Sequence, residues 1–336
     1  MKEQDLLISI LNNCLQPGVH VSSSTLRDSY TRSTQISHWD VRYSRRTDLP
    51  EQIVLKSTSN HLDSIKREGA FYSLVQKKEC SAALPPFIGW RATPSEAALA
   101  MEDMTPVFQP ATNKPSVAPP FALNEAIFYS LCTIHNDFLA HHVIREFSVD
   151  NLSGSLAEKM SNNRELILKN LGARSGSATL SALFLRLIDG LPALLRLRFS
   201  RGGSTTIIHG DFHPGNVLVS QQDEHPHVLI IDWPNWQPGF PTDDLAYYLT
   251  LCFPPGERAI QEIRLLESYY QNLSGEFRSY CTWKAFQSDY RVSILRSLAV
   301  AFLWLACESP QDWPWESLEF VLDAYRTWTC DSLLDS

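Results

Sequence analysis

The sequence predicts an α+β fold in which strands and helices occupy separate lobes. Alternating apolar and polar residues, typical of strands, are concentrated in the first hundred residues, and helical periodicity dominates from residue 121 onward. Between them, residues 105–120 hold five prolines, which is typical of a spacer. The 336 residues also match the length of about two domains. We expect a β-rich lobe over 1–100, a hinge over 101–106 and a mostly helical lobe over 107–336.

The N-terminal lobe is expected to begin with a helix over residues 2–15, which Pro17 and Gly18 end. Asn60 is a suitable cap for a second helix over 62–78, whose apolar residues fall roughly on one face. Short β-type runs separated by polar turns lie on either side of this second helix. They predict strands over 25–30, 38–43, 52–56, 87–90 and 97–101.

The C-terminal lobe is expected to be helical except for one β region. Its apolar residues recur at helical spacing, broken by Gly, Pro and polar clusters. The predicted helices cover 121–142, 155–170, 178–199, 242–253, 256–273, 282–307 and 315–328. The β region contains a strand at 206–208 and a hairpin of 217–219 with 228–231, whose turn lies at 220–226.

Polar residues stand at the strand ends of this β region. His209 and Asp211 follow the first strand, Asn216 precedes the second, and Asp232 ends the third. Adjacent strand ends would let Asp211, Asn216 and Asp232 converge. The spacing His-x-Asp-x-x-x-x-Asn matches the kinase catalytic loop, in which Asp accepts the proton of the substrate hydroxyl and Asn holds magnesium. Asp232 then stands where the second metal-binding carboxylate belongs.

These residue types suit that chemistry. Magnesium prefers oxygen ligands, so a carboxylate, an amide oxygen and the phosphates of ATP can hold it together with water. Asp211 must stay clear of the metal to orient the attacking hydroxyl. The alternative is an ordinary buried hairpin with a His-Gly turn, but three polar residues at this spacing between apolar strands rarely arise by chance. We predict Asp211 as the catalytic base, with Asn216 and Asp232 as metal ligands.

The motifs resemble those of the aminoglycoside phosphotransferase and choline kinase-like superfamily. The resemblance rests on HGDFHPGN at 209–216, IDW at 231–233 and DLAY at 244–247, and it extends roughly over 24–251. It implies a bilobal protein-kinase-like fold, ATP as the phosphoryl donor and Mg²⁺ as the metal. It also implies that Asp244 points back to brace the catalytic loop.

A lysine and a glutamate complete the nucleotide-binding pattern. Lys56 ends the apolar strand IVLK, as does the kinase lysine that reaches the α- and β-phosphates. Glu68, on the next helix and followed by Phe-Tyr as in the resembled family, would hold Lys56 by an ion pair. The alternatives are a surface lysine at a strand end and a solvated helix carboxylate, with Glu79 as a weaker competitor.

The resemblance assigns a hinge to the segment ALAMEDM. The backbone carbonyl of Glu102 and the backbone N–H of Met104 would bind adenine, with Met101 behind the base. No Gly-x-Gly-x-x-Gly motif lies between the first two strands. Ser33 and Thr34 would supply hydroxyl and N–H groups to the phosphates instead, or they form a plain polar turn.

Several further side chains have two interpretations. We expect His209 and His135 to have structural roles. His213 either touches phosphate or lines the loop. Thr242 is a suitable N-cap for the helix that carries Asp244. Trp233 and Trp236 follow the metal aspartate, so they either flank the substrate or simply pack, as most aromatic residues do.

The composition of the chain indicates which partners it can bind and in which compartment it is expected. A formal charge of −8 argues against a nucleic-acid binder, which needs a basic face. The seven cysteines are dispersed and form no Cys-x-x-Cys pair, which favours a reduced, cytoplasmic protein. The N-terminal residues lack the layout of a signal peptide, and the longest apolar run, 298–307, is too short to cross a bilayer. We expect no membrane association.

The sequence therefore predicts an enzyme that moves the γ-phosphoryl group of ATP, with magnesium, to a hydroxyl of a small molecule. Two alternatives stay open within this fold: an amino-alcohol kinase of the choline or ethanolamine type, and a catalytically silent nucleotide-binding module. A protein kinase is disfavoured, because only nine residues separate Asp232 from the helix expected at Thr242 and no Ala-Pro-Glu follows. The acceptor and the oligomeric state are not specified by the sequence.

Overall fold

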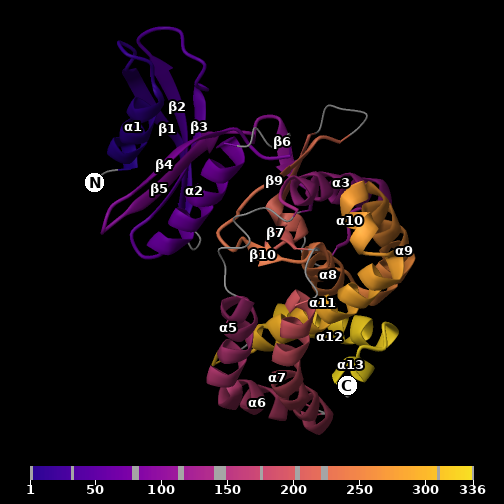
Figure 1. Cartoon of the computed structure of the whole chain (residues 1–336). Coiled ribbons are helices and arrows are strands. Elements are labelled where there is room, and N and C mark those ends of the chain that lie inside the picture. Colours follow the sequence, from indigo (N-terminus) through magenta and orange to yellow (C-terminus); the bar gives the residue numbers. More distant parts are fainter. Residues whose placement is uncertain are drawn as a thin grey trace. The chain divides into compact units, whose positions relative to one another are not determined.

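The computed structural model describes residues 3–31, 34–77, 83–112, 117–139, 149–174, 177–200, 205–220, 226–308 and 311–334 (Figure 1). The chain forms two compact units. Unit 1 comprises residues 1–110 and 216–236, and unit 2 comprises 111–215 and 237–336. The predicted α+β class is confirmed, because unit 1 carries a five-stranded sheet and unit 2 is mostly helical. Residues 216–236, which we expected in the C-terminal lobe, pack with unit 1.

The sheet of unit 1 is antiparallel throughout, in the order β1-β2-β3-β5-β4. Two helices accompany it in the chain, α1 (Glu3–Cys14) before β1 and α2 (Leu62–Lys77) between β3 and β4. All five predicted strands are present, several of them longer than expected. Their bounds are β1 Val21–Thr31, β2 Gln35–Tyr43, β3 Gln52–Thr58, β4 Phe87–Ala92 and β5 Ala97–Glu102.

Successive side chains of β3 point to opposite faces of the sheet. Ile53 and Leu55 are fully buried in a core that they share with apolar residues of α1. Side chains alternate between the two faces of a strand, so Lys56 points to the opposite face, where it meets Glu68 of α2. The helices α1 and α2 therefore cover opposite faces of the sheet (Figure 1).

Gly69 allows α2 to approach the sheet closely. A Cβ atom at this position would lie 2.5 Å from the indole of Trp90 in β4, a distance that real side chains do not adopt. The close approach places Glu68, the preceding residue, within reach of β3. The helix bounds agree with the predicted 62–78 to within one residue.

A second, three-stranded sheet of unit 1 contains the predicted hairpin. Strands β8 (Val217–Ser220) and β9 (Val228–Ile230) are antiparallel neighbours, as expected from the sequence. Strand β6 (Phe108–Pro110) pairs with β8 on its other side, in a stretch that we had interpreted as a spacer. Pro110 is tolerated there because β6 is an edge strand.

The described part of unit 2 is mostly helical and also contains a two-stranded sheet. Strands β7 (Thr206–Ile208) and β10 (Gln237–Gly239) pair antiparallel. The expected helix 155–170 is two helices, because the chain leaves the helical path at Asn163. The helices among the described residues are α3 Phe121–Asp137, α5 Val149–Asn162, α6 Arg164–Gly172, α7 Ser177–Ser200, α8 Pro241–Cys252, α9 Pro255–Asn272, α10 Gly275–Tyr280, α11 Trp283–Trp304, α12 Asp312–Thr327 and α13 Asp331–Leu334.

Helix α8 lies in the interior of unit 2. Eleven consecutive residues, Pro241–Leu251, are buried, and the helix packs against α9, α11 and α12. Thr242 is not the N-cap that we expected: Phe240 holds that position and Pro241 is the first helical residue. Proline suits this position because its ring fixes φ and it lacks an N–H that would have no partner there. The Thr242 hydroxyl accepts instead from the guanidinium of Arg198, at 2.5 Å.

Among the described residues, one segment, Ala178–Ser200 of α7, is long and apolar enough for a membrane span by length and composition alone. In unit 2 the helix packs against α5, α6, α11 and α13. Arg198, near its C-terminal end, is buried in an ion pair with Asp243 at 2.8 Å. The absence of membrane association stays a prediction.

Candidate active site

Unit 1 brings Lys56, Glu68 and Asp232 together in one charged cluster. The Nζ atom of Lys56 donates to Glu68 Oε2 at 2.6 Å and also to Asp232 Oδ1. Lys56 and Glu68 are buried, whereas the Asp232 side chain is 43% exposed. Burial alone would lower the pKa of Lys56, but the two carboxylates outweigh it and hold the pKa above its ordinary value. The lysine is therefore charged, and the predicted pairing with Glu68 is present.

The second oxygen of Glu68 fixes the chain after Asp232. Glu68 Oε1 accepts from the backbone N–H of Trp233 at 3.3 Å. One buried carboxylate thus holds both the lysine of β3 and the backbone that follows β9. Asp232 itself has a φ of 67°, in the left-handed region that few residues other than glycine adopt. Such strain is concentrated at functional sites, where the surroundings hold it in place.

The hairpin β8–β9 places Asn216 and Asp232 at the same end. Val217 pairs with Ile230, and the N–H of Ile231 donates to the carbonyl of Asn216 at 3.0 Å. Asp232 is the next residue, with a carboxylate that solvent can reach. A carboxylate and an amide oxygen are hard donors of the kind that magnesium prefers. The donor set of Asn216 and Asp232 therefore fits the predicted metal.

The predicted hinge is anchored by a residue that sequence reasoning passed over. Asp103 has a buried carboxylate that accepts from Arg27, from His38 Nδ1 at 2.8 Å, and from the hydroxyl and N–H of Thr105 at 2.6 and 3.0 Å. Burial would raise the pKa of Asp103, but the hydrogen bonds from Thr105 and His38 outweigh it and leave the pKa below its usual value.

The adenine-binding residues that we predicted lie beside this anchor. Met101 is buried at the end of β5, and Glu102 pairs with Ile53 of β3. The N–H of Glu102 donates to the carbonyl of Pro86 at 2.9 Å, and the carbonyl of Met104 accepts from Val107 and Phe108. The groups assigned to adenine, the Glu102 carbonyl and the Met104 N–H, stay predictions.

The predicted phosphate loop is described only in part. Ser33 lies outside the described residues. Thr34 is buried and directly precedes β2. Glu79, the weaker competitor for the lysine, also lies outside the described residues, whereas Glu68 makes the contact with Lys56.

In unit 2, Asp244 holds the backbone of the candidate catalytic loop. Its carboxylate is fully buried and accepts from the N–H of His209 at 2.7 Å and of Gly210 at 3.0 Å. Gly210 has a φ of 79°, which glycine adopts without cost. The expected brace is present, and the sharp turn at Gly210 presents Asp211 directly after it.

His209 and His135 support the loop from within, as expected for structural histidines. The buried His209 ring accepts from the N–H of Asp211 through Nδ1 at 3.3 Å. His135, fully buried on α3, contacts the Tyr269 hydroxyl through one ring nitrogen and Asp244 Oδ2 through the other, at 3.2 Å. Its backbone carbonyl accepts from Thr206 of β7 at 2.7 Å.

Asp211 has a partner that sequence reasoning missed. The hydroxyl of Tyr247 donates to Asp211 Oδ1. Tyr247 stands three residues after Asp244, so both project from one face of α8 toward the loop. This spacing was readable in the DLAY motif, but the contact itself depends on how α8 packs. His213 turns its ring toward its own loop, where Nδ1 accepts from the N–H of Gly215 at 3.1 Å.

The two tryptophans after Asp232 pack within unit 1. Trp233 is fully buried, and its ring stacks on Phe71 of α2 with centroids 4.0 Å apart. Trp236 donates through Nε1 to the carbonyl of Arg67 at 2.7 Å, and the Arg67 guanidinium donates back to its carbonyl at 2.6 Å. Both indoles thus pack against α2, which is one of the two interpretations that the sequence left open, and a contact of either tryptophan with the substrate stays a prediction.

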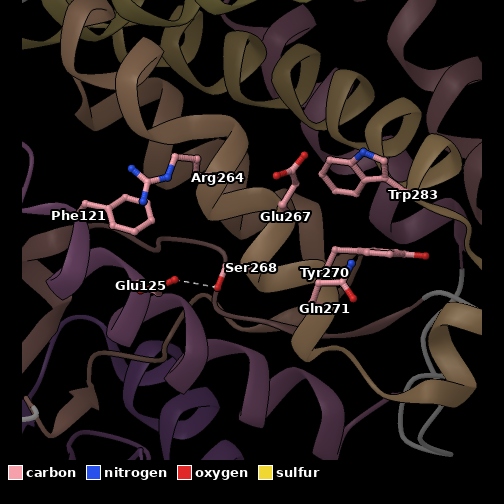
Figure 2. Close-up of a pocket in the computed structure, with 8 residues that line it drawn as sticks. All are labelled: Phe121, Glu125, Arg264, Glu267, Ser268, Tyr270, Gln271 and Trp283. Atoms are coloured by element: carbon pink, nitrogen blue, oxygen red, sulfur yellow. Dashed lines mark hydrogen bonds between the residues drawn. The ribbon is translucent and has the colours of Figure 1, made fainter.

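A hollow of about 480 Å³ lies elsewhere on unit 2, between α3, α9 and the start of α11 (Figure 2). The Arg264 guanidinium covers the ring of Phe121 at 4.0 Å, and Ser268 donates to Glu125 at 3.2 Å. None of the predicted site residues that the structure describes lines this hollow.

Part of the chain matches one protein family. Residues 158–276 match the model of the phosphotransferase enzyme family, APH. The match contains Asp211, Asn216, Asp232 and Asp244, whereas Lys56 and Glu68 precede it. No curated protein matches the sequence.

Two solved structures share the fold over nearly the whole chain. The spectinomycin phosphotransferase APH(9)-Ia, in complex with ADP and spectinomycin, has a TM-score of 0.51 and 13% identity, covering 99% of this chain and 97% of its own. The gentamicin complex of APH(2″)-IIa has a TM-score of 0.51 and 12% identity, covering 94% of this chain and 95% of its own. The family match and the shared fold together confirm that this chain resembles the aminoglycoside phosphotransferase and choline kinase-like superfamily.

Proposed function

We propose that this protein is an ATP- and magnesium-dependent phosphotransferase that moves the γ-phosphoryl group to a hydroxyl of a small molecule. The observation that carries the proposal is the buried ion pair of Lys56 and Glu68 at 2.6 Å, with Asp232 on the same ammonium group. Burying charged groups costs free energy, and a buried lysine held between two carboxylates adds little stability over apolar residues of similar size. It is well suited to grip phosphates that arrive with a cation.

The mechanism assigns each polar group one task. Lys56, oriented by Glu68, donates to phosphate oxygens. Asn216 and Asp232 supply the oxygen ligands for magnesium, which when bound would neutralise the charge of the phosphates. Asp211, whose backbone is held through His209 and Gly210, orients the acceptor hydroxyl and accepts its proton. Catalysis then consists mainly of positioning and charge stabilisation.

A small acceptor is favoured over a peptide. Only the eight residues 233–240 separate Asp232 from helix α8. Three of them form β10, which pairs with β7, and both tryptophans are buried. In protein kinases a long activation segment supports the peptide substrate. The segment 233–240 is too short to support an extended peptide in this way. Of the solved structures compared above, one contains spectinomycin and one contains gentamicin. Aminoglycoside-type alcohols are therefore the first acceptors to test, followed by amino alcohols such as choline.

The test is a screen with purified protein, Mg-ATP and a library of hydroxylated small molecules, read by mass spectrometry for the gain of one phosphate. Asp211→Asn is the matched control, because it keeps the shape of the side chain and removes the base. Phosphate gain that depends on Asp211 supports the proposal. Nucleotide binding in a thermal-shift assay with no acceptor turnover and no ATP hydrolysis would instead indicate the silent nucleotide-binding module. Labelling of protein substrates alone would indicate a protein kinase.

A further inference from the structure

The candidate base and its loop are held by neighbouring positions of one buried helix. Asp244 of α8 holds the loop backbone, and Tyr247, nearly one turn later, donates its hydroxyl to Asp211 Oδ1. Tyr247 is only 6% exposed, and its ring meets Trp304 of α11 edge to face, with centroids 6.0 Å apart. Helix, ring packing and hydrogen bond therefore fix the hydroxyl at a defined place beside the carboxylate.

Without such a donor, the carboxylate of an aspartate rotates easily about its χ2 bond. The χ2 torsion of aspartate is an sp³–sp² bond with shallow, roughly two-fold preferences, so the carboxylate plane turns easily. A general base must present one oxygen lone pair to the hydroxyl that it deprotonates, and misplacement is costly in rate. A donor bound to Oδ1 restricts this rotation and thereby sets where the other oxygen points.

Tyr247 remains a donor over the working pH range. Burial, together with the charge of Asp211 and the hydrogen bond to it, holds the pKa of Tyr247 well above its ordinary value. The phenol therefore keeps its proton when the carboxylate beside it is ionised.

We infer that Tyr247 is a positioning residue for phosphoryl transfer: its hydroxyl fixes the plane of the Asp211 carboxylate so that the acceptor hydroxyl meets it in one orientation. This inference rests on the proposed role of Asp211 as the base. It assigns a function to a side chain that no motif identified as functional. It also makes α8 one structural support for both the backbone and the side chain of the catalytic residue.

The chain supplies a matched control in the next residue. Tyr248 is also buried on α8, and its hydroxyl donates to Asn124 Oδ1 at 2.8 Å. Tyr247→Phe and Tyr248→Phe each remove one oxygen atom and one side-chain hydrogen bond from the same helix. Only the first variant removes a contact to Asp211.

The first measurement is the steady-state hydrolysis of Mg-ATP with water as the acceptor, repeated with any acceptor from the screen. We expect Tyr247→Phe to lower kcat about 10- to 100-fold, as for loss of a hydrogen bond to a charged group, with KM for ATP changed less than about three-fold. Tyr248→Phe should lower the thermal midpoint and leave kcat within about two-fold. A Tyr247→Phe enzyme with wild-type kcat, or with a loss equal to that of Tyr248→Phe, overturns the inference.

The second measurement does not require turnover. Crystal structures of the wild type and of Tyr247→Phe, both soaked with Mg-ADP, compare the orientation of the Asp211 carboxylate. The inference predicts one orientation in the wild type, with the Tyr247 hydroxyl in hydrogen-bond contact, and a turned or multiple orientation in the variant. An unchanged carboxylate plane in the variant refutes positioning by Tyr247. If the wild type turns over neither water nor any acceptor, the proposed function fails, while this comparison still decides whether the Tyr247 hydroxyl fixes the plane of the Asp211 carboxylate.

Discussion

Asp244 provides the most direct test of how unit 2 holds the candidate catalytic loop. The carboxylate is fully buried and accepts from the N–H groups of His209 and Gly210 and from Nε2 of His135. Asp244→Asn preserves the shape but leaves one acceptor oxygen, so an amide NH₂ group must face at least one of these donors. We expect the variant to lose both stability and turnover.

The magnitude follows from the contacts. A buried donor left without an acceptor costs about 1–3 kcal/mol, and replacing a charged acceptor by a neutral one weakens the bonds that remain. The loss is therefore about 2–4 kcal/mol, a large share of the 5–15 kcal/mol that stabilises a typical protein. With a urea dependence of about 3 kcal/mol per M, this loss lowers the unfolding midpoint by about 1 M.

The assay is urea unfolding followed by tryptophan fluorescence, with Thr250→Val as the control. Thr250 is buried on the same helix, and its hydroxyl donates only to the carbonyl of Ala246, which the helix already uses. The control should lose at most about 1 kcal/mol and keep its turnover. If Asp244→Asn unfolds at the same midpoint as Thr250→Val and turns over ATP normally, other groups hold the loop and the reasoning is refuted.

Three further predictions concern the charged groups of the site. Asp211→Asn should reduce turnover by about 10²–10⁴, the usual loss for a general base, while Mg-ATP affinity measured by calorimetry stays near that of the wild type; near-normal turnover would remove the assignment. Asp232→Ala should weaken nucleotide binding in magnesium but hardly in EDTA, so an unchanged metal dependence would move the metal site elsewhere. Folding lowers the pKa of Asp103, so its stabilising effect is complete above the unfolded value of about 3.9 and is lost as the pH falls through the folded value. Thermal unfolding of Asp103→Asn between pH 7 and 3 should show less acid destabilisation than the wild type, and parallel curves would contradict this linkage.

The sequence predicted the features that short segments determine. The loop from His209 to Asn216 and the hairpin to Asp232 could be read because a strand, a polar turn and a strand follow one another within 25 residues. The ion pair of Lys56 with Glu68 was also predictable, since a strand followed by a helix brings these two positions together through Gly69. In each case local periodicity and spacing carried the information.

The features that were missed depend on contacts between distant segments. Strand β6 lies among prolines, and its pairing with β8 joins residues about 110 positions apart, which no local pattern indicates. The contacts of the Asp103 carboxylate were not predicted, because its partners Arg27 and His38 come from β1 and β2. Trp233 and Trp236 were candidate substrate contacts by position, but Phe71 and Arg67 of α2 bind them in the interior.

The order in which the chain contributes to its two units has a consequence for biosynthesis. Unit 1 consists of residues 1–110 and 216–236, so its last segment is made 126 residues after its first segment ends. At about 5–20 residues per second, the ribosome needs roughly 6–25 s to bridge this interval. During this time residues 1–110 lack Asp232, so Lys56 and Glu68 are without the second carboxylate of their cluster. A fragment that stops at residue 110 should therefore reproduce this nascent state, in which Phe71 lacks the indole of Trp233 and the apolar surface of α2 is available to chaperones.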